Sequence, residues 1–277
     1  MIPDAHCHLD QLADPERAAH EAAEAGVHPI LAVSMDSVSA EAVLRLRDRL
    51  RGLVLAGVGL HPSRIPEIAA DEQERELRRL EALLGGADCV GEIGLDYKDA
   101  ATDSDRARQR EALDRQLEWA AARRLSVNLH SRRADREVME AAIAFHEKTG
   151  LGALLHWFTH SKKLVRRAAQ HGVFVSSGPS VLIDARTVDV AREIDEPVLL
   201  VETDSPVEYG AEGAARPVWA ARVLERLATA RGASAKDLAT IVRRNFDRYL
   251  GRELPSLQRE SRTTSRCILS SPCQRTD

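Results

Sequence analysis

The chain has 277 residues, of which 44% are hydrophobic and 30% are charged, and its formal net charge is −4. This balance is ordinary for a globular protein and excludes a broadly basic nucleic-acid coat. It does not exclude a nucleic-acid substrate, because divalent ions bound to the protein can supply positive charge locally. Aromatic residues make up only 4%. The core must therefore be built from aliphatic side chains, which favours α/β packing.

Eight short runs rich in β-branched residues or leucine predict strands. In chain order they are Ile2–His8, His28–Met35, Leu53–Leu60, Cys89–Leu95, Ser126–His130, Gly152–Phe158, Val173–Ser177 and Pro197–Glu202. Several are almost continuously apolar, which is typical of strands buried on both faces of a parallel sheet.

Longer segments with helical periodicity separate these runs. They are Pro15–Ala25, Ser39–Arg51, Asp71–Leu84, Asp105–Arg124, Ala134–Lys148 and Lys162–His171, and two more, Pro217–Arg231 and Ala235–Leu250, follow the last strand. The alternation predicts an α/β fold, a (β/α)8 TIM barrel spanning residues 1–252. A doubly wound sheet is the alternative, weakened because no G-x-G-x-x-G turn follows the first strand.

The ends of the chain and its cysteines bear on location. Residues 253–277 are rich in Ser, Thr and Arg, and we interpret them as a disordered tail. The N-terminal residues do not form a secretory signal, and no apolar run approaches the roughly 20 residues of a membrane span. The cysteines Cys7, Cys89, Cys267 and Cys273 show no C-x-x-C spacing. We therefore expect a cytoplasmic protein without membrane contact.

Metal-binding residue types recur where the predicted strands end. In a barrel of this kind the active site is built from the carboxyl ends of the strands. The residues are His6, His8, Glu92, His130, His156 and Asp204. Six such side chains at successive strand ends indicate a site for divalent metal ions.

The surroundings of these residues support the same interpretation. His6 and His8 are two positions apart in a strand, so both imidazoles lie on one face. Glu92 lies in an apolar run, where a carboxylate costs several kcal/mol unless it is paired or bound to a metal. Each element alone has a simpler explanation, because His130 or His156 could be a core histidine and Asp204 could cap a turn before Pro206.

Short strings spread along the chain resemble TatD-type metal-dependent hydrolases, a branch of the amidohydrolase-like barrels associated with DNase activity. The strings are DAHCHL at 4–9, GLHP at 59–62, GEIGLDY at 91–97, LHSR at 129–132, HWFT at 156–159, ETDSP at 202–206 and NFDRYL at 245–250. The resemblance covers all of the chain except the tail.

The resemblance implies two divalent ions, Mg²⁺, Mn²⁺ or Zn²⁺. His6, His8, Glu92 and Asp204 would bind one ion, and Glu92, His130 and His156 would bind the other. Glu92 would bridge the two, and Asp204 would carry the proton of the attacking water.

Three further residues are assigned to the substrate. His61 is expected to contact the substrate or to bind a third metal ion. Arg132 could hold a phosphate, and Trp157 could stack on a terminal base. Trp157 and His160 depart from the usual family pattern at the rim of the site, which bears on substrate preference.

The function expected from the resemblance is a 3′–5′ exonuclease acting on DNA, on single strands or frayed ends. Hydrolysis of an amide, ester or lactone is the second hypothesis, since the same ligands could serve attack on a carbonyl. A non-catalytic, metal-stabilised partner protein is the third. The helices show no exposed apolar stripe, so we expect a monomer.

Overall fold

The computed structural model describes residues 1–157 and 161–255, and its eight strands form one parallel sheet in sequence order. The strands are β1 (Ile2–Cys7), β2 (Val27–Val33), β3 (Val54–Val58), β4 (Cys89–Asp96), β5 (Ser126–Arg132), β6 (Ala153–Leu155), β7 (Phe174–Ser177) and β8 (Leu199–Val201). Each strand pairs with the next one along the chain.

The first and last strands meet, so the sheet is a nearly closed barrel. The Asp204 amide donates to the His6 carbonyl at 3.0 Å, and the His8 amide donates to the Ser205 carbonyl at 2.8 Å. The strand order confirms the predicted α/β fold, a (β/α)8 barrel. It contradicts the doubly wound alternative, in which the first strand lies inside the sheet and the order reverses.

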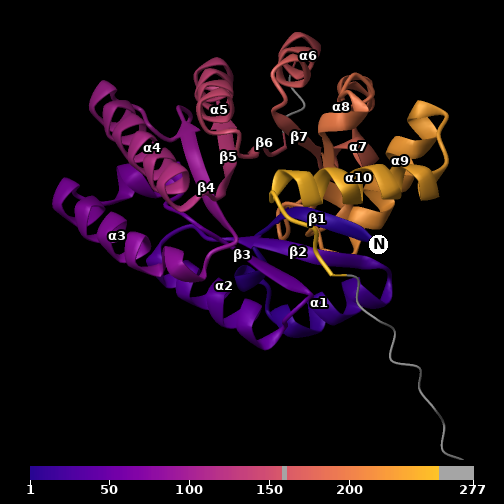
Figure 1. The fold of residues 1–277 in the computed structure, drawn as a ribbon, viewed down its shortest axis with the longest axis horizontal. Coiled ribbons are helices and arrows are strands. Elements are labelled where there is room, and N and C mark those ends of the chain that lie inside the picture. Colours follow the sequence, from indigo (N-terminus) through magenta and orange to yellow (C-terminus); the bar gives the residue numbers. More distant parts are fainter. Residues whose placement is uncertain (158–160, 256–277) are drawn as a thin grey trace, which may run out of the picture.

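The helices form the outer layer around the strands (Figure 1). They are α1 (Pro15–Glu24), α2 (Ser37–Arg49), α3 (Ala70–Leu83), α4 (Asp103–Arg123), α5 (Asp135–Thr149), α6 (Lys162–Gln170), α7 (Ser180–Ile183), α8 (Ala185–Ala191), α9 (Trp219–Arg231) and α10 (Ala235–Tyr249). Short 3-10 turns occupy Leu9–Gln11, Pro62–Glu67, Leu84–Gly86, Glu196–Val198 and Gly210–Glu212. Within the described ranges, every helix is too short or too polar to cross a membrane.

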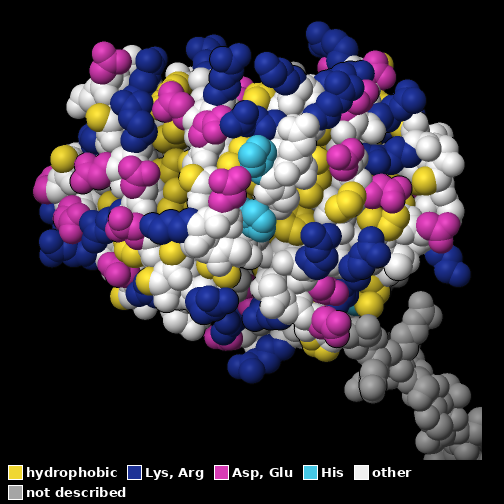
Figure 2. Space-filling model, turned by 45° about the horizontal axis from the view of Figure 1, so that its top comes forward, with side chains coloured by type: hydrophobic (Ala, Val, Ile, Leu, Met, Phe, Trp, Pro, Cys, Tyr) yellow, Lys and Arg dark blue, Asp and Glu magenta, His cyan; other side chains and the backbone are white. Residues whose placement is uncertain are grey.

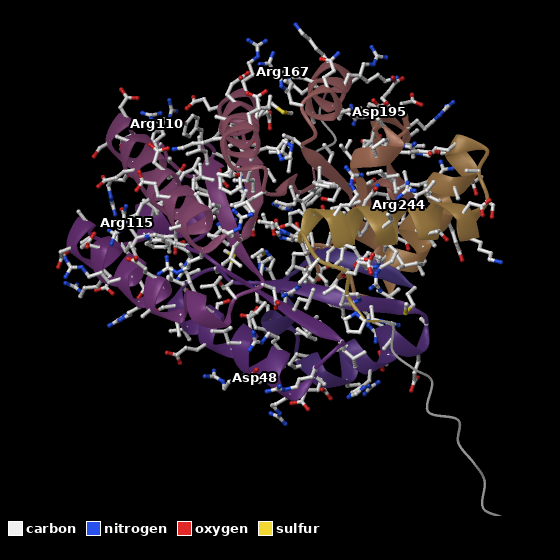
Figure 3. The ribbon with its side chains drawn as sticks, in the orientation of Figure 1. Asp48, Arg110, Arg115, Arg167, Asp195 and Arg244 are labelled. Carbon is white, nitrogen blue, oxygen red and sulfur yellow. The ribbon has the colours of Figure 1, made fainter. Side chains whose placement is uncertain are left out.

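Local sequence signals explain where the main helices begin. The side chains of Asp14, Thr102 and Ser234 each accept a hydrogen bond from a backbone amide in the first turn of α1, α4 and α10. Such caps satisfy amide groups that have no partner inside the helix. The outer helix faces carry charged side chains that point away from the strands, as Arg115 on α4 and Arg167 on α6 do (Figure 3).

Helix α10 covers the junction where the barrel closes. It contacts both β1 and β8, and its Phe246 and Tyr249 side chains are fully buried. The Asn245 side-chain amide donates to the Leu199 carbonyl at 2.9 Å. The contact with Leu199 lies at the amino end of β8, so α10 supports the barrel from the end opposite to His6 and Asp204.

Several predicted boundaries were wrong by a few residues. Strand β6 is shorter than the predicted 152–158, because Trp157 has a φ of 41°, which a strand cannot accommodate; Phe158 lies outside the described residues. Pro197 lies in the 3-10 turn Glu196–Val198 instead of beginning a strand. Of the predicted tail, only residues 253–255 are described, and they form neither helix nor strand.

Candidate metal centre

The six residues predicted to bind metal lie together at the carboxyl ends of the strands. Glu92, on β4, is buried between two groups of side chains and presents one carboxylate oxygen to each. The first group contains His6, His8 and Asp204, and the second contains His130 and His156. The family resemblance assigned the same residues to two ions in the same two groups.

The first group surrounds Glu92 Oε2. This oxygen lies 3.4 Å from His6 Nε2 and 3.2 Å from His8 Nε2. Asp204 Oδ1 lies 3.4 Å and 3.5 Å from the same two nitrogen atoms. Two carboxylate oxygens and two imidazole nitrogens therefore face one point, which is the ligand set of a divalent cation.

The second group surrounds Glu92 Oε1. This oxygen lies 2.7 Å from His156 Nε2 and 2.9 Å from His130 Nδ1. The two imidazole nitrogens are 3.3 Å apart. His61 reaches the same oxygen from beyond β3, with Nε2 at 3.4 Å.

Asn128 on β5 determines which His6 nitrogen carries hydrogen. Its side-chain nitrogen donates to the Ala5 carbonyl at 3.0 Å, and a carbonyl can only accept. Asn128 Oδ1 therefore faces His6 Nδ1, 2.9 Å away, and accepts its hydrogen. In neutral His6 this leaves the Nε2 lone pair directed at Glu92 and Asp204.

Asp96 at the end of β4 acts on His130 in the same manner. Asp96 Oδ1 already accepts the backbone amides of Lys98 and Asp99. Its Oδ2 lies 3.2 Å from His130 Nε2 and accepts the hydrogen there. The His130 Nδ1 lone pair then faces Glu92 Oε1.

These lone pairs make the residues fit for divalent cations. His6 Nε2 and Glu92 Oε2 are both buried and have no hydrogen-bond partner in the described part of the chain. A cation between these atoms would satisfy groups that are costly to leave unpaired. Neither Asn128 nor Asp96 was given a role from the sequence.

The hydrogen bonds of His61 differ from those of the other histidines. The Ser63 backbone amide donates to His61 Nδ1 at 3.1 Å, so this nitrogen is an acceptor and the hydrogen of the neutral ring lies on Nε2. Burial lowers the pKa of His61 to about 4, which keeps the ring neutral. His61 Nε2 is therefore a hydrogen-bond donor, which suits a contact with substrate better than a third metal ion.

The two other residues predicted to bind substrate lie at the edge of the site. The Arg132 side chain is 48% exposed, with Nη1 3.8 Å from Asp96 Oδ2. Trp157 is half-buried and packs on Tyr209, with ring centroids 5.6 Å apart. His160 lies outside the described residues.

Without cations the centre holds protons. Burial and His6 would lower the pKa of His156, but Glu92 and Glu202 raise it to about 9. Burial would likewise lower the pKa of His6, and Glu92 and Asp204 raise it well above its ordinary value. A divalent cation must displace these protons before it can bind.

We therefore expect metal affinity to depend on pH. At pH 7 the binding of Mn²⁺ should release protons, and affinity should rise about tenfold per pH unit for each displaced proton up to about pH 9. The folded-state pKa of His156 exceeds its ordinary 6.5, so the cation-free protein should lose stability between pH 6.5 and about 9. Calorimetry in buffers of different ionisation enthalpy measures the released protons; heats that are independent of buffer would contradict the expectation.

The chain is similar over most of its length to known proteins. The family model described as TatD related DNase matches residues 3–251. The human protein named deoxyribonuclease TATDN3 is 27% identical, over 88% of this chain and 92% of its own. The protein from Pantoea vagans named 3′-5′ ssDNA/RNA exonuclease TatD is 28% identical, over 84% and 91%.

A solved structure extends the comparison to the fold. The metal-dependent hydrolase YjjV of Escherichia coli is 32% identical, over 87% of this chain and 95% of its own. The crystal structure of this TatD homologue superposes with a TM-score of 0.79 and covers 90% of this chain and 97% of that one.

Proposed function

The chain belongs to the TatD-related DNase family, and on this basis we propose that it hydrolyses phosphodiester bonds from the 3′ end of DNA single strands or frayed ends. The observation that carries the proposal is Glu92, whose two oxygens each face a separate group of metal-binding side chains. The relative named as a 3′-5′ ssDNA/RNA exonuclease supports the polarity and the kind of substrate.

Two divalent cations would occupy the centre. His6, His8, Glu92 and Asp204 would hold one, and Glu92, His130 and His156 the other. When bound, such ions lower the pKa of water toward neutrality and offset the negative charge of a phosphodiester. On the face drawn in Figure 2, Lys and Arg are interspersed with Asp and Glu. The side chains of this face therefore give a phosphate no broad positive field, and bound cations would supply the missing positive charge.

Asp204 would handle the proton of the attacking water. Burial would raise the pKa of Asp204, but the hydrogen bond and charge of His6 lower it, so the carboxylate is ionised at neutral pH. An ionised carboxylate beside the reacting water can accept its proton and pass it to the leaving oxygen. The proposal keeps for Asp204 the role of proton carrier that we expected from the sequence.

Three residues would orient the substrate. His61, with its hydrogen on Nε2, would donate to a phosphate oxygen. Arg132 projects from the end of β5 and would contact a phosphate, where its planar guanidinium can donate two hydrogen bonds. Trp157 would stack on the terminal base, with its ring packed against Tyr209 at a tilt.

We also propose that the protein is a cytoplasmic monomer. In the described ranges, the large hydrophobic side chains that are exposed are Met1 before β1, Val38 on α2 and Ile183 on α7, which offer no broad apolar surface for a partner. Cys7 and Cys89 are buried free thiols, as a reducing compartment favours. Light scattering of the purified protein tests the monomer.

A nuclease assay tests the function. With Mg²⁺, Mn²⁺ or Zn²⁺, the wild type should shorten a 5′-labelled single strand stepwise, release little from a blunt duplex, and stop on addition of a chelator. A phosphorothioate linkage placed inside the strand should stop stepwise hydrolysis at that position. Absence of nucleotide release with every metal would contradict the proposal.

The same assay includes the two alternatives. Turnover of an amide, ester or lactone panel in place of DNA would favour acyl hydrolysis, and tight metal binding without any turnover would favour a non-catalytic protein. No contact among the described residues favours either alternative over phosphodiester hydrolysis.

A further inference from the structure

Glu202 is a buried carboxylate that the proposed function leaves without a role. It directly follows β8 and is fully buried. Its Oε2 accepts a hydrogen bond from Ser176 Oγ at 2.5 Å. Its Oε1 is buried without a hydrogen-bond partner in the described chain. Because a buried charge is costly unless it is compensated, this oxygen requires a donor.

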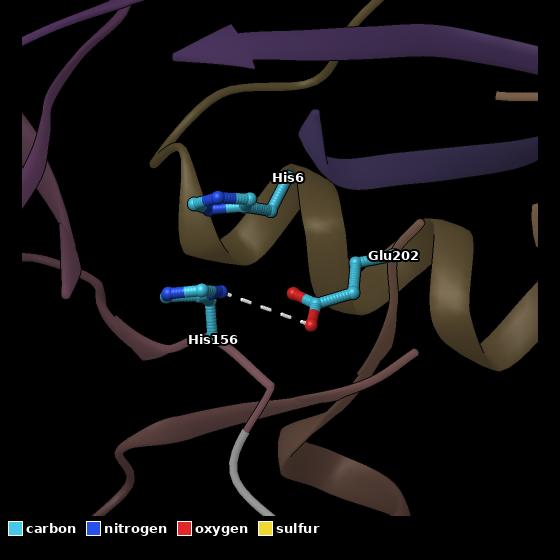
Figure 4. Close-up of side chains that lie close together, drawn as sticks. All are labelled: His6, His156 and Glu202. Atoms are coloured by element: carbon cyan, nitrogen blue, oxygen red, sulfur yellow. Dashed lines mark ion pairs between the residues drawn. The ribbon is translucent and has the colours of Figure 1, made fainter. Parts of the chain in front are cut away.

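The nearest candidate donor is His156. Its Nδ1 lies 3.9 Å from Glu202 Oε1, and it too is buried without a partner among the described residues (Figure 4). The opposite nitrogen of the ring, Nε2, lies 2.7 Å from Glu92 Oε1. The His156 ring therefore lies between two carboxylates, one in the metal centre and one behind it.

We propose that Glu202 is a positioning residue for His156. By accepting the hydrogen of Nδ1, it would keep the Nε2 lone pair directed at the cation that Glu92, His130 and His156 hold. The proposal rests on the metal binding of the proposed function. A carboxylate behind an imidazole ligand fixes the orientation of the ring and raises its basicity.

The other histidines of the centre provide an internal comparison. His130 is supported by a carboxylate, Asp96, at 3.2 Å. His6 is supported by the neutral amide of Asn128 at 2.9 Å. Both carboxylate supports therefore act on the group around Glu92 Oε1, and Glu202 should affect the binding of that cation and not of the other.

A third cation between His6, His156 and Glu202 is the competing arrangement, since these side chains lie close together. The His6 and His156 rings stack with centroids 3.8 Å apart and planes within 6° (Figure 4). Imidazole lone pairs lie in the plane of the ring, so two stacked rings do not direct them at one point. His6 Nδ1 is also engaged by Asn128. These contacts disfavour a third cation. His156 Nδ1 and Glu202 Oε1 are 3.9 Å apart, so the proposed hydrogen bond requires a small movement of the ring or the carboxylate toward the other.

The substitution Glu202→Gln tests the role. Glutamine keeps the size of the side chain and a partner for Ser176, but it removes the charge behind His156. Titration of the cation-free protein with Zn²⁺ should show two binding steps in the wild type. In E202Q one step should weaken about 10- to 100-fold while the other stays unchanged.

A matched control separates positioning from a general loss of charge. Glu208→Gln removes the same charge from an exposed side chain six residues further along the chain and should leave both steps unchanged. Glu202 helps to raise the pKa of cation-free His156 to about 9, so the melting temperatures of cation-free E202Q and wild type are compared above pH 9, where this ring is neutral in both. There the two should stay close, which a purely structural role would not allow.

Each other outcome has a distinct meaning. A wild type that binds no Zn²⁺ would contradict the proposed function itself. Two wild-type steps that E202Q reproduces unchanged would overturn only the role of Glu202. Three steps in the wild type and two in E202Q would overturn it in favour of a third cation.

A spectroscopic measurement on the wild type covers the case in which E202Q does not fold. Two-bond ¹⁵N–¹H spectra of the histidine rings report which nitrogen carries hydrogen. In the Zn²⁺-loaded protein, His156 should carry its hydrogen on Nδ1. A His156 ring with its hydrogen on Nε2 would overturn the proposal.

Discussion

Replacing Glu92 with glutamine should lower kcat on single-stranded DNA by about a thousandfold or more while the barrel stays folded. Glutamine has nearly the same shape, but one of the two oxygens becomes an amide nitrogen that cannot bind a cation. One of the two groups around Glu92 must then lose its shared ligand. A cation that stabilises a developing phosphate charge is worth several kcal/mol, and ~4 kcal/mol corresponds to about three powers of ten in rate.

The measurement is single-turnover hydrolysis of a 5′-labelled strand, with Zn²⁺ stoichiometry determined on the same sample. Glu118→Gln, on the exposed face of α4, removes the same charge far from the centre and should leave both quantities unchanged. An E92Q protein that keeps two tightly bound ions and wild-type turnover would exclude Glu92 as the bridge.

Replacing Gly94 with alanine should lower the free energy of unfolding by about 3–5 kcal/mol. Gly94 has a φ of 144°, and an added Cβ would lie 2.1 Å from the His130 carbonyl oxygen. The added Cβ on β4 and the carbonyl oxygen on β5 belong to neighbouring paired strands, so moving either atom away would cost free energy. Overpacking costs typically 1–3 kcal/mol and a strained backbone conformation on the order of 1–3 kcal/mol more.

Urea denaturation of the cation-free protein measures this change without interference from metal binding. Gly85→Ala is the matched control, because no atom lies within 4 Å of the Cβ that it would add. If the two variants unfold at the same urea concentration, the close approach of β4 and β5 at Gly94 is not what requires glycine there. Since the contact is with the backbone of His130 itself, a folded G94A protein should also bind the Glu92–His130–His156 cation more weakly.

Much of the fold could be predicted because a parallel barrel leaves a simple trace in the sequence. Its strands are buried on both faces, so each appears as an apolar run, and strand order follows chain order. The helices α7 and α8 were missed because segments of four and seven residues are too short to show helical periodicity. The end of β6 was missed because nothing in the sequence signals the left-handed backbone of Trp157.

The ligands of the candidate site were predictable because side chains at the carboxyl ends of barrel strands converge. The residues behind the ligands were not. Asn128 matters because it bonds both the Ala5 carbonyl and His6, and Glu202 because it lies beside His156. Those relations depend on ring rotation and on contacts between distant strands, which spacing along the chain does not encode.

The closure of the barrel has a consequence for how the enzyme comes into being. His6 and His8 belong to the first strand, whereas Asp204 follows the last one and is joined to β1 by the amide-to-carbonyl bond with His6. A cation held by all three closes a loop of about 200 residues. During synthesis, the growing chain cannot assemble this position until β8 has left the ribosome. Unfinished chains would therefore lack the proposed nuclease activity.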